Sequence, residues 1–124
     1  MWVFMNDAMF SAVEDENDSN SVVVRARLED DLKTAFGPRV VVIESEDSDY
    51  RFRIFTTKDH LKLALTTYVD SCLNYPNFKG SIDPKDKVRY EAYTGVWSVL
   101  YRLQERLYPR SNESGWWTNY RNNG

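Results

Sequence analysis

The sequence predicts an α+β fold with a largely antiparallel sheet and helices packed on one face of it. β-Branched or alternating segments fill the first half of the chain, and segments with helical spacing fill the second half. The length of 124 residues is usual for one domain, and 42% of the residues are apolar. We therefore expect a single α+β domain over residues 1–110, followed by an aromatic tail at residues 111–124 that is flexible or docked.

The chain opens with a predicted β-hairpin. Residues 2–5 and 9–13 are apolar segments that flank the turn residues Asn6 and Asp7. Residues 14–20 are too polar to bury, so we expect a surface loop there.

Three more strands and a short helix are predicted next. Residues 21–28 form a strand that is β-branched at first and then alternates. Residues 29–36 begin with three acids, which favour a helix N-terminus, and a Gly-Pro pair ends this helix. Residues 40–44 and 50–55 are strands on either side of an acidic turn.

Two longer helices complete the prediction. The pattern from Thr56 to Asp59 is typical of a helix start, and Asp83 with Pro84 opens the last helix. The first of these helices has an apolar face made of Leu61, Leu65, Tyr68 and Cys72. The second has one made of Tyr93, Val96, Trp97, Leu100, Leu103 and Leu107. We predict that Trp97 is a core residue in contact with the helix that carries Leu61 and Leu65.

The order of these elements along the chain indicates a particular α+β architecture. Its middle runs strand, helix, strand, strand, helix, which is most of a ferredoxin-like (split βαβ) unit. The N-terminal hairpin would supply the remaining strands. We therefore predict a ferredoxin-like core with an N-terminal hairpin.

Residues suited to catalysis or metal binding are few and isolated. His60 is the only histidine, and we expect it to face solvent in a first helical turn rather than act as a general base. Cys72, the only cysteine, is expected in the core, and it leaves no internal disulfide or Cys-based zinc site. The glycines form no phosphate loop, and the acids of residues 44–49 lack the calcium-loop pattern. We predict no catalytic residue, no metal site and no cofactor.

The two alternating strands offer a candidate binding surface. Arg25 and Arg27 share one face of the first strand, and Arg51, Arg53 and Phe55 share one face of the second. The opposite faces carry Val24, Ala26 and Leu28 on the first strand and Tyr50, Phe52 and Ile54 on the second. If these apolar faces meet the helices, the arginines stand on the open face of the sheet. There they could grip phosphate or carboxylate groups, or bind RNA beside an aromatic ring. The alternative is that they pair across strands with acids such as Glu14 or Glu44.

The tail is a second candidate binding surface. Trp116, Trp117 and Tyr120 stand among Ser, Asn and Gly, and Trp and Tyr are enriched at binding hot spots. The alternative is that these rings fold back and cover the domain.

Several motifs together resemble a group of small bacterial and phage proteins. That group opens Met-Trp-x-Phe and carries Val-Arg-Ala-Arg, Asp-Tyr-x-x-Arg, Tyr-x-Asn-Phe-Lys and Val-Trp-Ser-Val. Here these are residues 1–4, 24–27, 49–53, 75–79 and 96–99, and the aromatic tail departs from the resemblance. The group has no assigned activity, so the resemblance implies no mechanism. It directs attention to the arginine strands and to residues 75–79.

These observations favour binding over catalysis. We expect a non-catalytic protein-binding module, such as a phage-borne adaptor or inhibitor of a host defence system. The alternative is a binder of nucleic acid or of a phosphorylated ligand that uses the arginine face. The net charge of −3 is neither the positive excess of a general nucleic-acid binder nor the charge of a DNA mimic. A lone cysteine, no signal-peptide pattern and no apolar span predict a cytoplasmic protein without membrane contact. Oligomerisation is left open.

Overall fold

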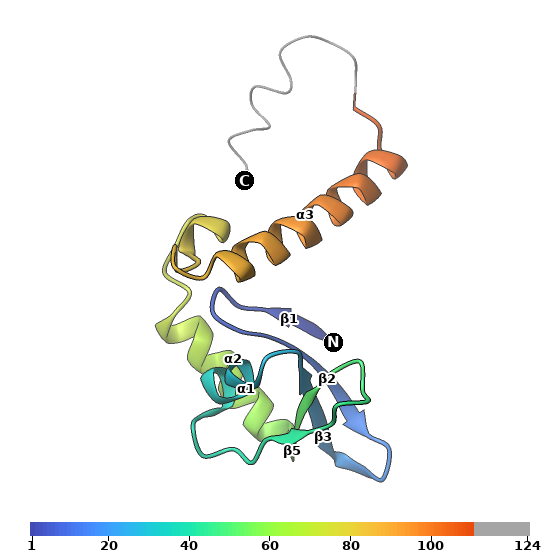
Figure 1. Ribbon diagram of the computed structural model, residues 1–124, viewed down its shortest axis with the longest axis vertical. Coiled ribbons are helices and arrows are strands. Elements are labelled where there is room, and N and C mark those ends of the chain that lie inside the picture. Colours follow the sequence, from blue (N-terminus) through green and yellow to red (C-terminus); the bar gives the residue numbers. More distant parts are fainter. Residues whose placement is uncertain (111–124) are drawn as a thin grey trace. The chain divides into compact units, whose positions relative to one another are not determined.

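The computed structural model describes residues 1–110 (Figure 1). The chain divides into two compact units, residues 1–74 and residues 75–124. The first unit contains the five strands and two helices, and the described part of the second contains one long helix with the loop before it. The expectation of a single domain over residues 1–110 stays a prediction, as does the separate tail.

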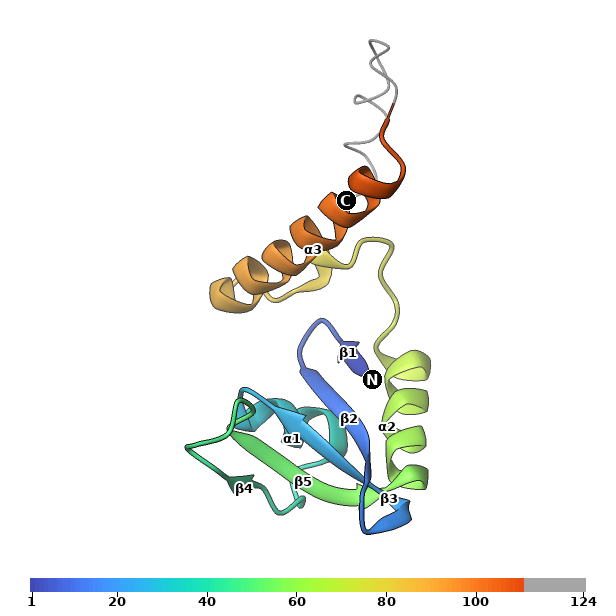
Figure 2. The ribbon, with the colours of Figure 1, turned by 90° about the vertical axis from the view of Figure 1, so that its right-hand side faces the viewer.

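The first unit is built on a five-stranded sheet in which every neighbouring pair is antiparallel. The strand order is β1-β2-β3-β5-β4, with β4 at one edge (Figure 2). The strands are β1 (Trp2–Phe4), β2 (Met9–Asp15), β3 (Asp18–Ala26), β4 (Ile43–Glu44) and β5 (Phe52–Thr57). The predicted α+β class and antiparallel sheet are confirmed, whereas the ferredoxin-like arrangement is not.

Helices α1 (Glu29–Phe36) and α2 (Lys58–Ser71) pack on one face of this sheet. Leu32 and Phe36 of α1 and Ala64 of α2 share one core with Val24 and Ile54 of the sheet. Burial of each large apolar side chain in such a core contributes about 1.5–3 kcal/mol. The helices therefore occupy the face that alternation assigned to the core.

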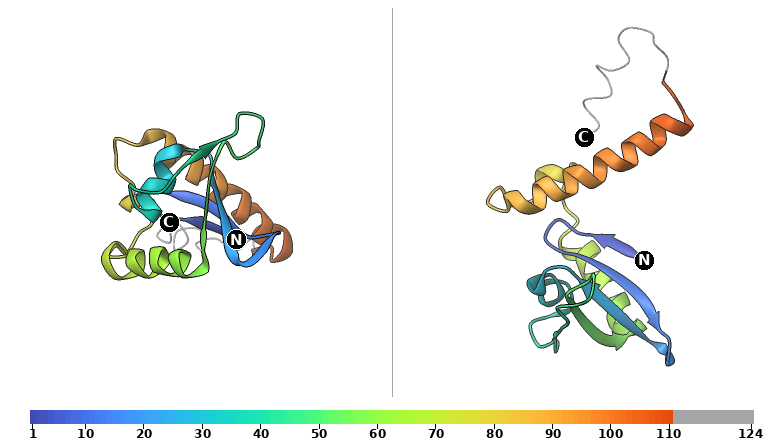
Figure 3. Two further views of the ribbon diagram at one scale, coloured as in Figure 1. Left: turned by 90° about the horizontal axis from the view of Figure 1, so that it is seen from below. Right: turned by 45° about the vertical axis from the view of Figure 1, so that its right-hand side comes forward.

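The connection between β2 and β3 is tighter than the loop expected at residues 14–20. Asp15 and Asp18 are paired, so the polar residues continue the two strands almost to the turn. The turn is stabilised locally, because the Asn17 N–H donates to the Asp15 carboxylate and the Asn20 N–H to Asp18. The last residue of β5, Thr57, pairs with Ser21, so the tip of the hairpin extends beyond β5 (Figure 3). A polar strand is tolerated there because it covers no core.

Helix α2 forms where it was predicted but differs in detail at its two ends. The helix starts within the predicted pattern, but its N-cap is Thr57 and not Thr56, because the Thr57 hydroxyl accepts a hydrogen bond from the His60 N–H. Cys72, however, is exposed and lies at the C-cap, so its prediction as a core residue is wrong. The helix ends at Ser71, so Cys72 lies at its C-terminal end and not within the helix face that meets the sheet.

The second unit packs the start of α3 (Lys87–Leu107) against the loop that precedes it. This loop contains a short 3-10 helix, η1 (Lys79–Ser81). The Tyr93 ring stacks on Phe78 at 5.7 Å between centroids, and Tyr93 is 4% exposed. Asp86, not Asp83, is the N-cap of α3, because its carboxylate accepts from the Arg89 N–H. Asp83 instead accepts from the Lys85 N–H in the preceding turn.

Trp97 is not the core residue that helical spacing predicted. It is 39% exposed, its ring stacks on Tyr101, and the Lys79 ammonium lies 4.6 Å from its centroid. Both contacts lie within the second unit. Periodicity identified an apolar helix face correctly, but most of that face is not buried in the described part of the chain.

Candidate functional site: an arginine cluster on the open sheet face

Register places two arginines at the centre of the sheet face opposite the helices. Ala12, Val24 and Ile54 are Cα partners across β2, β3 and β5, and all three are buried in the core. Their sequence neighbours Ser11 on β2, Arg25 on β3 and Arg53 on β5 form the next row of Cα partners. Because successive side chains alternate, this second row points to the open face.

Arg25 and Arg53 therefore stand directly opposite each other on neighbouring strands. Like charges in this position are destabilising, by the same few tenths to about 1 kcal/mol that opposite charges contribute. Each guanidinium is held by a neutral oxygen: Arg25 donates to the Ser11 hydroxyl at 2.9 Å, and Arg53 to the Ser48 hydroxyl at 3.0 Å. The Nε atoms of both arginines are buried without a hydrogen-bond partner.

Tyr50 adds a third arginine to the group. The guanidinium carbons of Arg25 and Arg27 lie 4.8 and 4.4 Å from the centroid of its ring. Arg27 also donates to the backbone carbonyl of Asp49 at 2.8 Å. Arg25, Arg27, Arg53 and Tyr50 are named the arginine cluster below. Cation–π contact holds the charges in place but does not neutralise them.

Tyr50 corrects the sequence prediction, which placed it with Phe52 and Ile54 on the core face. Strand β5 begins only at Phe52, so the alternation of that strand does not extend back to Tyr50. The ring contacts the arginines of β3 instead.

Arg51 does not join the cluster. Its Nε lies 2.6 Å from a carboxylate oxygen of Glu44, and one of its terminal nitrogens lies 3.4 Å from Glu46. The alternative of cross-strand ion pairs thus holds for this arginine. Glu14, the other acid considered, pairs with Lys58 at 3.0 Å. Within residues 1–110, Arg25, Arg27 and Arg53 form no ion pair.

Exposed apolar side chains flank the cluster on the same face. Phe55 is two residues beyond Arg53 on β5 and is 56% exposed. Trp2 is the Cα partner of Ser11 and Ile43 is the partner of Arg53, and they are 73% and 45% exposed. The sequence alone did not single out Trp2 or Ile43, because only the strand register brings them to this face.

The two carboxyls whose pKa values are lowered, Asp18 and Asp86, do not belong to the arginine cluster. The side chain and then the backbone N–H of Arg89 hydrogen-bond Asp86 and lower the pKa of that carboxyl. The Asn20 N–H and then the Ser21 hydroxyl lower the pKa of Asp18. Both shifts arise from local caps and turns.

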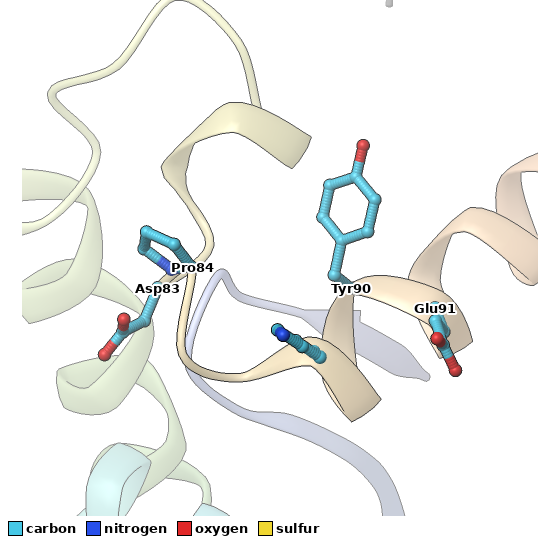
Figure 4. Close-up of a pocket in the computed structure, with 5 residues that line it drawn as sticks. Asp83, Pro84, Tyr90 and Glu91 are labelled. Atoms are coloured by element: carbon cyan, nitrogen blue, oxygen red, sulfur yellow. The ribbon is translucent and has the colours of Figure 1, made fainter.

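Two other places in the structure were considered as sites, namely His60 and a shallow pocket at the start of α3. His60 is half-buried, contrary to its predicted solvent position: its Nδ1 lies 2.7 Å from the Thr56 hydroxyl and its Nε2 3.0 Å from the Phe36 carbonyl. The second unit has a pocket of about 260 Å³ with Pro84 and Tyr90 in its wall. Figure 4 shows the Asp83 and Glu91 carboxylates on opposite sides of it. Its wall is mainly apolar and the two acids point away from each other.

Three further findings concern the described residues as a whole. No group of three or more His, Cys, Asp or Glu side chains among them is arranged to hold a metal ion. None of the helices in residues 1–110 has the length and apolar character to cross a membrane. The predicted binding residues Trp116, Trp117 and Tyr120 lie outside the described residues.

Comparison of the chain with family models, with curated proteins and with solved structures finds no match. The resemblance to small bacterial and phage proteins therefore stays a prediction. The case for function rests on the chemistry of the cluster, whose guanidinium N–H groups can bind a carboxylate or phosphate through paired hydrogen bonds.

Proposed function

We propose that this chain is a non-catalytic protein-binding module, and that its open sheet face receives an acidic segment of a protein partner. The observation that carries the proposal is the arginine cluster. Arg25, Arg27 and Arg53 lie together without an ion pair in residues 1–110, and two of them are directly opposite each other. A partner carboxylate would relieve this repulsion and gain charge-assisted hydrogen bonds.

The surroundings of the cluster favour a protein partner over a nucleic acid. Exposed Phe55 and Trp2 beside arginines match the composition of protein interfaces, where aromatic residues and Arg are enriched. The ring of Tyr50 already has two guanidiniums near it, so it is poorly placed to stack on a base. The net charge of −3 opposes binding to a long chain of phosphates.

A module of this kind acts by occupying a surface. Its expected roles are those of an adaptor or an inhibitor, including the phage-borne inhibitor of a host system that the sequence suggested. In either role the arginines would set orientation and specificity, and the apolar residues around them would supply buried area.

The proposal is tested by selecting ligands from a library of random peptides on the wild-type protein, with counter-selection on the R25Q/R53Q double variant. We expect the selected peptides to be rich in Asp and Glu and to contain apolar residues. Arg53→Gln should weaken their binding by about tenfold or more, since a hydrogen bond to a charged group contributes about 1.5–3 kcal/mol.

Arg51→Gln is the matched control, because Arg51 lies two residues away but is paired with Glu44 and Glu46. It should change peptide affinity little. Selected peptides without acidic residues, or an equal loss in the Arg51 control, would overturn the proposal. So would tighter, salt-dependent binding of a short oligouridylate than of any selected peptide, which would instead support the nucleic-acid alternative.

A further inference from the structure

The open sheet face changes in character along the direction of its strands. Val23 on β3 is the Cα partner of Phe55 on β5, and Phe55 is 56% exposed. Two residues further along β3, Arg25 stands opposite Arg53. Arg27 follows after two more residues, and alternation gives it the same face. The face therefore presents one apolar row and then two cationic rows, each two residues from the last.

The spacing of these rows matches that of an extended peptide. Successive residues of a strand rise about 3.3 Å, so rows two residues apart are about 6.6 Å apart. An extended ligand has the same rise, and its side chains at positions i, i+2 and i+4 point to one side. On an α-helix, residues two apart do not face the same way. Extended chains that pack face to face on a sheet also keep to within about 30° of its strand direction.

The chain itself contains an example of two acids, separated by one residue, that bind an arginine of this sheet. Oxygens of the Glu44 and Glu46 carboxylates lie 2.6 and 3.4 Å from nitrogens of Arg51, the residue just before β5. Arg25 and Arg53, in contrast, donate to serine hydroxyls, and the Nε atom of each has no hydrogen-bond partner. Both therefore retain N–H groups with which to bind carboxylates of a second acidic segment.

We infer that the arginine cluster recognises an extended segment of the protein partner in which one apolar residue and two acids occupy alternate positions. The apolar side chain contacts Phe55, the nearer acid is bound by Arg25 and Arg53, and the farther acid is bound by Arg27. The inference rests on the proposed function and adds to it the conformation and the spacing of the bound segment. The rows determine this spacing but not the chain direction of the segment.

Fluorescence anisotropy with synthetic peptides and the full chain tests the inference. The dye-labelled peptides are Thr-Leu-Thr-Glu-Thr-Glu-Thr and the same sequence reversed. Each is compared with a control peptide of identical composition and charge in which the two glutamates are adjacent. We expect one of the two alternating peptides to bind about tenfold more tightly than its control or better, because adjacent side chains of an extended peptide point to opposite sides.

A double-mutant cycle tests which arginine binds the farther acid. Replacing the glutamate farther from the leucine by glutamine should weaken binding to the wild type about tenfold. The same replacement should change binding to Arg27→Gln by no more than about twofold, because the partner of that glutamate is already removed. Arg51→Gln is the matched control and should retain the full loss, since Arg51 is paired with Glu44 and Glu46.

Three results would overturn the inference. The alternating and adjacent peptides could bind equally well and both lose affinity in Arg53→Gln, which would leave the proposed function in place. All of the peptides could fail to bind at millimolar concentration. Arg27→Gln could retain the full loss on replacement of the farther glutamate, with a fold that circular dichroism shows to be intact. The selection from a random library fixes no spacing, so it decides the proposed function separately.

Discussion

Arg25 and Arg53 face each other across β3 and β5, and neither forms an ion pair with an acid in the described chain. Glu44 and Glu46, two acids of the segment beside β5, pair with Arg51 instead. A sheet that needed only stability would place opposite charges or neutral side chains at this position. The arrangement therefore carries a cost in the free protein that a bound acidic group would remove.

The cost itself can be measured without a ligand. A double-mutant cycle over Arg25→Gln and Arg53→Gln should give an unfavourable coupling of roughly 0.2–1 kcal/mol between the two arginines. The coupling should shrink as NaCl is added, because salt screens exposed charges. Urea unfolding of the four proteins provides the free energies. A coupling that is zero or favourable at low salt would show that the repulsion is absent.

His60 connects the two helices of the first unit. The Phe36 carbonyl can only accept, so Nε2 donates to it, and Nδ1 is hydrogen-bonded to the Thr56 hydroxyl. His60→Ala should lower the free energy of unfolding by about 1–3 kcal/mol, through two lost hydrogen bonds. Lys62→Ala on the same helix, where the side chain is 76% exposed, should change it by less than about 0.5 kcal/mol. Equal effects of the two changes in urea unfolding would contradict this role.

Tyr93, not Trp97, is the aromatic anchor of α3. Tyr93→Ala should destabilise the second unit by about 3–5 kcal/mol, as for other buried large aromatic residues. Trp97→Ala should cost no more than about 1.5 kcal/mol, because the Trp97 ring is partly exposed and contacts mainly Tyr101 and Lys79. Chemical denaturation followed by helical circular dichroism compares the two. A larger loss for Trp97→Ala would mean that the helix face was misassigned.

The N-terminus of α3 should weaken in acid. The hydrogen bonds from Arg89 lower the pKa of the Asp86 carboxyl in the folded chain. A group whose folded pKa is lowered stabilises the fold above its unfolded pKa, and this contribution is lost as the pH falls through the folded pKa. The stability difference between the wild type and Asp86→Asn should therefore be constant near neutral pH and shrink below about pH 4. A difference that stays constant down to pH 2 would contradict it.

Local patterns predicted the elements that depend on neighbouring residues. The hairpin around Asn6 and Asp7, the start of α2 within residues 56–59 and the end of α1 at Gly37 follow from turn and cap chemistry, and Gly37 indeed has a φ of 104°. Burial of Val24 and Ile54 followed from alternation along their strands. These signals act within a few residues, so a single sequence contains them.

The sequence predicted less where the structure depends on distant partners. Alternation placed Arg25 and Arg53 on one face, but only the register shows that they are direct partners. The ion pair between Arg51 and Glu44 forms because β4 lies beside β5. Helical spacing marked Leu100 as apolar without indicating what covers it. In each case the missing information is which segments meet.

The central claim is that Arg25, Arg27 and Arg53 are held ready for a carboxylate, and a titration with succinate followed by NMR at the arginine Nε–H groups tests it most directly. The three signals should shift together and saturate at millimolar succinate, as expected for a few charge-assisted hydrogen bonds, while the signal of Arg51 should barely move. Chloride at equal ionic strength should not reproduce the shifts. Absence of any shift, or a shift of Arg51 as large as that of Arg53, would contradict the claim.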